Sequence, residues 1–465
     1  MAENVDKPVK APANKLKPEQ FQSVVKHIES YPRVNSHYCR ATSRRKYLPQ
    51  DLNIAKMHNM YLVSVKQKHF GDIEPVRLTT YRKIFHENFN LGFHRPKKDQ
   101  CVICLRHRNS PSNEQQNLYQ AHIDRKVASQ AAMRADKKAA EDDRNNRIRS
   151  ITFDVQSVLY TPCSQASLLY YKRKLAVYNF TIYQQDTPHD AECFLWPEYE
   201  GKRGACEIAT CLYKYIQSLP ASVTKLSTFS DTCTGQNRNQ YVAAMFLKAV
   251  RDSEIITQID QKFLEKGHTS MSVDSMHSEI EQAKKGLSMY CYGDWKTVIS
   301  MCRRSRPYVV REMKHADFMD WKSFATQQGI GWAKRNTNGM AVKWLEIKWM
   351  QYRHDSPNSI FYKLGFDIDS PFYEIKLKPT DRLLRQRAET DGVPCLYDRS
   401  IPISKKKHAD LLELCAGPSP VIPSEYHAFY TNLLTETHVA DCLAESDVSD
   451  RRFMTSGETF WCVKY

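Results

Sequence analysis

The sequence predicts an α/β protein whose core, between residues 150 and 290, is a mixed five-stranded sheet with flanking helices. Three observations lead to this fold class. Strand-like and helix-like runs alternate within 150–290, a long helical run precedes them, and a basic segment rich in aromatic residues follows them. The length of 465 residues is sufficient for two or three domains.

Five parts follow from the composition along the chain. Residues 1–17 are rich in Lys, Pro, Ala and Asn, lack the apolar centre of a secretory signal, and predict a disordered start. Residues 18–109 predict a helical, zinc-associated region, and residues 110–149 predict one long helix. The core at 150–290 is followed by 291–465, where we expect a small, basic α+β region and an extended tail.

Helices dominate the expected structure before the core. Short ones are predicted at Pro18–Ser30, Pro49–Gln67 and Leu78–Asn88. In the long helix, Ser112 is a suitable N-cap with Gln115 three residues later, and no Pro or Gly interrupts the run that follows. Its apolar stripe is shallow, so a solvated spacer, a partner helix for dimerisation and a DNA-facing arm all remain open.

The core elements are predicted in the order β-β-β-α-β-α-β-α. Runs rich in Val, Ile, Tyr and Phe mark the strands, and apolar residues at helical spacing mark the helices. The predicted strands are Arg149–Gln156, Lys174–Gln184, Ala191–Trp196, Val223–Phe229 and Ile255–Leu264. The predicted helices are Gly204–Gln217, Asn237–Arg251 and Val273–Lys285.

Fewer elements can be assigned after the core. Ala341–Tyr352 and Phe372–Leu377 have strand-like composition. Asp410–Cys415 and Tyr426–Glu436 predict short helices.

Charge and cysteine usage narrow the class of protein. The chain has 68 Lys and Arg residues against 52 Asp and Glu, a formal net charge of +16, which favours polyanionic partners. No apolar stretch reaches the roughly 18 residues needed to span a membrane. The 14 cysteines, without an export signal, indicate a reducing compartment. We therefore expect a nucleic-acid-binding protein.

Four carboxylates are predicted to converge at one edge of the core sheet. Asp154 lies on the first strand, Asp231 follows the fourth, Glu207 begins the first helix, and Asp274 opens the last helix. Such a group repels itself unless cations occupy it. Two magnesium or manganese ions would resolve the repulsion and could activate an attacking hydroxyl and stabilise the leaving oxygen of a phosphodiester.

In this order and context, the carboxylates resemble those of the ribonuclease H-like superfamily of transposase and integrase type. The residues that carry the resemblance are Asp154, Cys206–Ala209, Ser230–Asp231, and Lys266–His268 with Asp274. The resemblance implies that Asp154 bridges both ions, that Glu207 and Asp231 bind one, and that Asp274 binds the other. It also implies that His268, on a mobile loop, assists proton transfer or product release.

The chain also resembles a narrower group, uncharacterised eukaryotic proteins derived from transposable elements. The matching pieces are Ser36–Arg40, Arg45–Pro49, Phe89–Leu91, Pro96–Cys101, Glu207–Ile208, Gly267–Thr269, Asp274 and His277. This resemblance implies a DNA-processing protein in the nucleus that cuts or joins phosphodiesters and can form homo-oligomers. A domesticated DNA- or chromatin-binding protein, a ribonuclease acting on RNA/DNA hybrids, and an interaction scaffold remain alternatives.

Two features depart from the superfamily pattern. The gap between Asp154 and Glu207 is long, and the segment 157–171 is a candidate insertion. The last ligand is an aspartate where transposases often use a glutamate. His277 and Glu281 follow Asp274 on the same helix face, at i+3 and i+7, and are candidate neighbours of the site.

Cys101 and Cys104 form a CxxC pair whose thiolates can bind one zinc ion. A complete site needs two more ligands. We expect His37 and Cys39 to be these ligands because they lie in the same region, and His94 and His107 are the alternative ligands. A buried cysteine pair and a redox pair are the alternatives, although the βαβ context of a redox motif is missing.

Basic and aromatic residues are interleaved after the core. Cations there could follow a phosphate backbone while aromatic rings stack on bases, or the rings could simply be core residues. Lys405–Lys407 is a short candidate for a nuclear import signal. The basic and aromatic stretches are Arg303–Tyr308, Lys334–Arg335, Lys343–Trp344, Lys348–Trp349 and Tyr352–Arg353.

Overall fold

The computed structural model forms two compact units, residues 1–100 and 101–465. The second unit contains three of the predicted parts, which are the long helix, the core and the C-terminal region. The residues that the structure describes are 16–31, 46–48, 52–93, 101–109, 112–164, 166, 168–169, 172–187, 190–330, 335–377, 392–417 and 420–439.

In the described part of the N-terminal unit, three helices, α1 (Pro18–Glu29), α2 (Ile54–Lys66) and α3 (Leu78–Asn88), pack around one apolar core. A short parallel pair, β1 (Lys46–Leu48) and β2 (Leu91–Phe93), accompanies them. All three predicted helices are confirmed. The second begins later than expected, because the Asn53 side chain accepts a hydrogen bond from the Lys56 N–H and caps the helix there.

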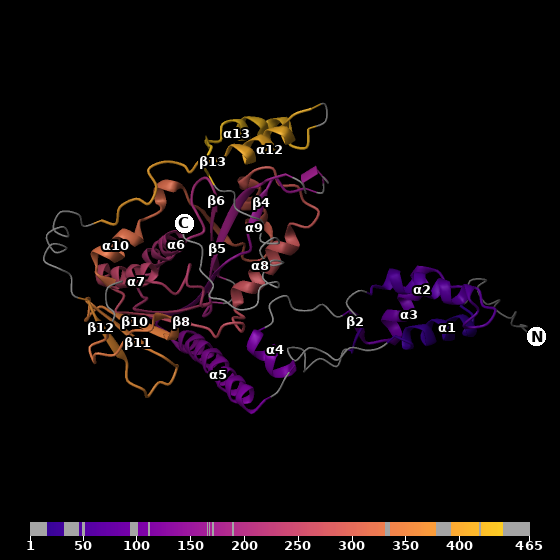
Figure 1. Ribbon diagram of the computed structural model, residues 1–465, viewed down its shortest axis with the longest axis horizontal. Coiled ribbons are helices and arrows are strands. Elements are labelled where there is room, and N and C mark those ends of the chain that lie inside the picture. The colour runs from indigo at the N-terminus through magenta and orange to yellow at the C-terminus, as the bar shows by residue number, and fades with distance from the viewer. Residues whose placement is uncertain are drawn as a thin grey trace, which may run out of the picture. The chain divides into compact units, whose positions relative to one another are not determined.

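A large mixed sheet organises the second unit (Figure 1). Its strand order is β12-β11-β10-β8-β7-β3-β5-β6-β9, and β4 pairs with β5 beside this path. The strands are β3 (Ile148–Val155), β4 (Leu159–Thr161), β5 (Leu175–Gln184), β6 (Ala191–Pro197), β7 (Lys225–Ser230), β8 (Gln258–Phe263), β9 (Val309–Glu312), β10 (Trp349–Arg353), β11 (Ser359–Lys363) and β12 (Tyr373–Lys376).

The α/β class with a mixed sheet is confirmed, and the five predicted core strands are contiguous in the order β6-β5-β3-β7-β8. Strand β3 pairs antiparallel with β5 and parallel with β7, and β7 pairs parallel with β8. The predicted number of five strands is too low, because β9 pairs with β6 at one end of the sheet and β10, β11 and β12 extend it beyond β8. These additions cover backbone groups that β6 and β8 would otherwise expose as edge strands.

The strands added from residues 291–465 also correct the expectation of a separate small α+β region. Strand β10 pairs antiparallel with β8, and Met350 and Tyr352 on it are fully buried in the main core. Only the last third of the predicted strand 341–352 is a strand, since a short 3₁₀ turn, Trp344–Glu346, precedes β10. The predicted strand 372–377 is confirmed as β12.

Helices cover both faces of the sheet (Figure 1). On one face, α6 (Ala205–Gln217), α7 (Gln240–Asp252) and α10 (Trp321–Gln327) pack on one another and on the apolar residues Ile151, Phe153 and Val155 of β3. On the other face lie α5 (Asn113–Asp142), α8 (Ser272–Ala283) and α9 (Tyr292–Met301). Alternation along β3 therefore turns Ser150, Thr152 and Asp154 toward the α5 and α8 face.

The long helix α5 packs on the sheet, so the interpretation as a solvated spacer is wrong. Its N-cap is Ser112, as predicted, and His122, Ser129 and Ala140 are buried. Ala132 and Met133 contact an apolar cluster that includes Phe229 and Val273.

A small C-terminal layer completes the second unit. It consists of α12 (Lys405–Cys415), α13 (His427–Thr431) and the parallel pair β13 (Ile403–Ser404) and β14 (Thr435–Glu436). The helix predicted at 410–415 begins earlier, because Ser404 caps it by accepting from the Lys407 N–H. The helix predicted at 426–436 ends at Thr431. The remaining helices are short 3₁₀ turns at His315–Asp317 and Ser424–Tyr426, and α4 (Val102–Asn109).

Burial of one lysine weakens the predicted import signal at 405–407. Lys407 is 3% exposed, and its Nζ lies 2.7 Å from Oε1 of Glu198. This lysine stabilises the packing of α12 and is not presented to a receptor. Among the described helices, none is long and apolar enough to cross a membrane.

The packing of α5 can be tested at Asp136. The buried Lys262 ammonium lies 2.5 Å from Oδ2 of Asp136 and 4.1 Å from the Trp349 ring centre. Asp136→Ala leaves that charge without its carboxylate and should lower the free energy of unfolding by about 3 kcal/mol. Tryptophan fluorescence in urea is the measurement, because all 7 tryptophans lie in the second unit.

The control is Asp142→Ala, at an exposed position on the same helix, which should change stability by less than about 0.5 kcal/mol. Equal, small effects of the two substitutions would contradict the packing of α5 on the sheet.

Candidate metal centres

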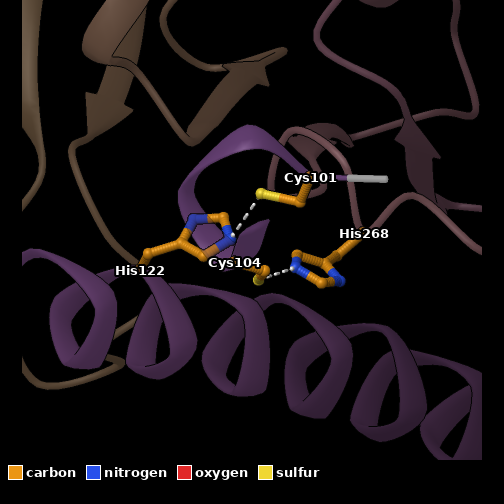
Figure 2. A group of neighbouring side chains, drawn as sticks. All are labelled: Cys101, Cys104, His122 and His268. Carbon is orange, nitrogen blue, oxygen red and sulfur yellow. Dashed lines mark hydrogen bonds between the residues drawn. The ribbon is translucent and has the colours of Figure 1, made fainter. Parts of the chain in front are cut away.

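Two groups of side chains among the described residues could each hold a metal ion. One is Asp154, Asp274 and His277, here called the carboxylate site. The other is Cys101, Cys104, His122 and His268, here called the Cys/His cluster (Figure 2). Within each group, the potential ligand atoms all lie within 4.8 Å of one another. Both groups belong to the second unit.

Sheet topology brings the carboxylate site together. Asp154 is the last residue but one of β3 and stands opposite Thr181 of β5 in the strand register. Strand β7 runs parallel to β3 and is followed directly by Asp231, so both aspartates reach the same sheet edge. Asp274 lies in the first turn of α8, after β8, the next parallel strand.

Short hydrogen bonds orient these side chains. Asp154 Oδ1 accepts from the Val155 N–H at 2.8 Å, and Asp274 Oδ2 accepts from the Met271 N–H at 2.9 Å, at the start of α8. His277 lies one helical turn beyond Asp274, and its Nε2 is 3.2 Å from Thr181 Oγ1. Asp274 and His277 therefore approach Asp154 from one helix face.

Burial and electrostatic repulsion both act on the carboxylate site. Burial, and then the charges of Asp231 and Asp274, raise the pKa of Asp154 to about 7, although the Arg203 charge opposes the rise. Burial also raises the pKa of Asp274. Burial and the Arg203 charge lower the pKa of His277 to about 4, so this imidazole is neutral at pH 7 and able to donate a lone pair. A cation would relieve the repulsion between the carboxylates.

Asp231 interacts with Asp154 through its charge but lies outside the tight group of three. Its Oδ1 accepts from the Cys233 N–H at 3.0 Å and from the side-chain amide of Asn237. These two donors hold the carboxylate in the turn that follows β7. Of the predicted ligands, Asp154 and Asp274 therefore lie within the group of three, and Asp231 acts on Asp154 through its charge.

Glu207, predicted as a fourth ligand, is not in the group. It lies in the first turn of α6, and its Oε1 accepts from the Lys202 N–H at 3.0 Å and from the Tyr397 hydroxyl. Burial raises the pKa of this carboxyl, whereas the hydrogen bond from Tyr397 lowers it. In this position Glu207 holds the turn that contains Arg203, a residue that sequence reasoning missed because no motif marks it.

Three segments that are distant in sequence form the Cys/His cluster (Figure 2). Cys101 precedes α4 and Cys104 lies on it, His122 lies on α5, and His268 lies in the loop between β8 and α8. Cys101 Sγ is 3.2 Å from His122 Nε2, and Cys104 Sγ is 3.3 Å from His268 Nε2. Both cysteines are free thiols.

Burial favours the uncharged forms of two members of the cluster, Cys104 and His268. Burial and the neighbouring Cys101 raise the pKa of Cys104 to about 11. Burial, followed by the charge of Lys126, lowers the pKa of His268 to about 4. An ion that binds here would displace the proton of the Cys104 thiol and meet a neutral His268 imidazole.

The Cys/His cluster differs from the predicted zinc site in two of its four members. The CxxC pair takes part as expected, whereas His37, Cys39 and the alternative ligand His94 lie outside the described residues. The other alternative ligand, His107, stacks on Tyr119 with ring centres 3.9 Å apart.

His268, predicted as a catalytic residue beside the carboxylates, lies in this cluster instead. Sequence reasoning missed His122, because a histidine on a charged helix carries no local signal.

Several of the basic and aromatic stretches have partners within the fold. Lys348 Nζ lies 2.8 Å from Oε2 of Glu265, and Trp349 Nε1 donates to Asp260 at 2.6 Å. The Arg353 guanidinium lies 4.0 Å from the Phe361 ring centre. These groups stabilise the sheet edge around β10, so their presence in the sequence is not by itself evidence for a nucleic-acid surface.

Comparison with known proteins gives one match. Residues 199–335 match a family described as a domain of unknown function (DUF7869). The matched segment includes Asp231, His268, Asp274 and His277, whereas Asp154 and the CxxC pair precede it. Neither a curated protein nor a solved structure matches the chain.

Repulsion at the carboxylate site predicts that Asp154→Asn stabilises the metal-free protein. A folded-state pKa of about 7 means that ionising Asp154 costs stability as the pH rises from about 4 to about 7. Without added divalent ions, the variant should exceed the wild type in free energy of unfolding by roughly 2–4 kcal/mol at pH 8 and by much less at pH 5. Urea denaturation at both pH values measures this.

Added Mn²⁺ should reverse the order, because it stabilises the wild type and not the variant. Asp369→Asn, at an exposed position on the same unit, should show neither effect. A variant that is less stable than the wild type at pH 8 without metal would contradict the repulsion.

Proposed function

We propose that this chain is a metal-dependent phosphodiesterase acting on DNA, built on a ribonuclease H-like core and derived from a transposable element. The observation that carries the proposal is that Asp154 and Asp274 lie close enough to share one ion with His277, at a sheet edge where the charge of Asp231 also acts on Asp154. Carboxylates gathered this closely are expected to bind divalent cations.

The sheet supports the same conclusion. Five contiguous strands, β6-β5-β3-β7-β8, make a mixed sheet of the kind that the resemblance implies, and the carboxylates follow the strands in the implied order. The net charge of +16 favours a polyanionic substrate. A nuclear location belongs to the same proposal.

Asp154, Asp274 and His277 are the proposed ligands of one ion, and Asp231 shares a second with Asp154. Hard carboxylate oxygens suit magnesium and manganese, and the His277 nitrogen favours manganese. Bound there, the ions would activate the attacking hydroxyl and stabilise the leaving oxygen. We therefore expect Mn²⁺ to act at lower concentrations than Mg²⁺.

Arg203 is the proposed phosphate-binding residue of the site. Its charge influences both Asp154 and His277, and its guanidinium contacts the Gln156 carbonyl at 3.4 Å. Glu207 is a positioning residue, because it holds the adjacent Lys202 N–H. A positive charge fixed beside the ions would stabilise the phosphate as negative charge develops on it.

Cleavage assays test the proposal. The purified chain is incubated with labelled duplex DNA and with an RNA/DNA hybrid, in Mg²⁺, in Mn²⁺ and without either ion. Cleavage should require the ion and should fall on the order of a hundredfold or more in Asp154→Asn and in Asp274→Asn. Asp369→Asn should cleave like the wild type, because it keeps every proposed ligand.

Each outcome separates the candidate functions. Preference for duplex DNA supports a transposase-like enzyme, and preference for the hybrid supports a ribonuclease. DNA binding without cleavage under any ion would overturn the enzymatic proposal and indicate a domesticated DNA-binding protein. Cleavage that survives Asp154→Asn would show that the activity comes from elsewhere.

A further inference from the structure

We propose that Cys101, Cys104, His122 and His268 bind one zinc ion, and that this ion anchors the loop leading to Asp274. The binding of zinc does not depend on the proposed function. The effect on Asp274 rests on it, since that residue is a proposed ligand of the catalytic ion. The cluster would connect α4 and α5 to the catalytic edge of the sheet (Figure 2).

The donor set favours zinc. Two sulfurs and two imidazole nitrogens are the soft and borderline ligands that Zn²⁺ takes in structural sites, usually four in tetrahedral geometry. In such a site a sulfur and a nitrogen lie about 3.5 Å apart, from bond lengths of about 2.3 and 2.0 Å. The two measured sulfur–nitrogen distances, 3.2 and 3.3 Å, are slightly shorter, so the side chains need little movement to admit the ion.

A buried carboxylate orients one of the histidines. Glu265 is 7% exposed, and its Oε1 accepts from His122 Nδ1 at 3.1 Å. This bond places the ring proton on Nδ1 and leaves the Nε2 lone pair directed at the cluster. Arg125 and Lys348 also contact Glu265, at 3.2 and 2.8 Å, and hold it ionised. Such carboxylate–histidine pairs commonly support metal-binding imidazoles.

Close backbone approach fixes the other histidine. Gly267 has φ +79°, and a Cβ at this position would lie 2.9 Å from Cys101 Cβ. Only glycine fits this conformation and this contact. The His268 carbonyl accepts from Gln130 Nε2 of α5 at 3.3 Å. The loop is therefore shaped to bring His268 against Cys104.

The loop connects the two metal centres. Five residues separate His268 from Asp274, whose carboxylate caps the start of α8 through the Met271 N–H. Between them, Met271 and Val273 pack against Ala132 and Met133 of α5. Zinc would fix the segment at His268. This would restrict the positions of Asp274 and His277 relative to Asp154.

Metal analysis of the full chain tests the zinc site. The purified protein should contain one zinc ion per chain. After removal of zinc and addition of Co²⁺, its spectrum should show the visible bands of tetrahedral cobalt and thiolate charge-transfer bands in the near ultraviolet. A wild-type protein without bound zinc, in which Co²⁺ produces no such bands, would overturn the inference.

Matched variants locate the ion. Cys104→Ser and His268→Asn should lose the bound zinc, whereas Cys395→Ser and His354→Asn, at exposed positions, should keep it. Loss of zinc from all four variants alike, or from none, would contradict the assignment. If Cys104→Ser does not fold, the cobalt spectrum of the wild type still decides.

The anchoring of Asp274 has its own measurement. Removing zinc should weaken Mn²⁺ binding at the carboxylate site by about tenfold or more, as judged by titration of the wild type with and without zinc. Asp154→Asn should lose Mn²⁺ binding and keep zinc, so failure of the nuclease proposal and failure of the zinc site are distinguishable. Unchanged Mn²⁺ affinity after zinc removal would overturn the anchoring.

Discussion

Repulsion between crowded carboxylates is the constraint on which the sheet edge around Asp154 depends. Asp154, Asp231 and Asp274 approach one another at the ends of neighbouring elements, and burial with mutual repulsion raises the pKa of Asp154 to about 7. Such an arrangement is unfavourable by itself, so the packing of the rest of the fold must offset its cost. The elements that impose it are β3, β7 and α8, which pack through extensive apolar clusters on both faces of the sheet.

The packing around the site explains why so many charged residues face inward without serving chemistry. Lys262 pairs with Asp136, Lys348 pairs with Glu265, and Lys407 pairs with Glu198, each joining a helix or an added strand to the sheet. Buried pairs of this kind contribute little net stability but are costly to break, so they favour one arrangement of the elements over others. Part of the Lys and Arg content of the sequence is therefore explained by ion pairs inside the fold.

Local patterns in the sequence predicted the core strands and helices, because each of these elements has its own periodicity. The joining of β9–β12 to the main sheet was not predictable, since strand pairing between residues such as Met350 and Gln261 leaves no mark in either strand. The neighbourhood of Asp154 and Asp274 was predictable from parallel topology. The hydrogen bond of Glu207 with Tyr397 and the contacts of His122 with Cys101 and of His268 with Cys104 were not predictable. They depend on contacts across more than a hundred residues or on a helix orientation.

The segment from Glu265 to Asp274 links these observations. Glu265, its first residue, accepts a hydrogen bond from His122, and Gly267 leaves room for Cys101. His268 contacts Cys104, and Asp274, the last residue, lies close to Asp154. Ten consecutive positions thus serve two clusters of opposite character, one of thiols and imidazoles and one mainly of carboxylates. The first cluster supplies the sulfur and nitrogen atoms that zinc takes in structural sites, and the second supplies mainly the carboxylate oxygens that suit magnesium and manganese. A zinc ion in the first would offset the stability that the crowded carboxylates cost in the second.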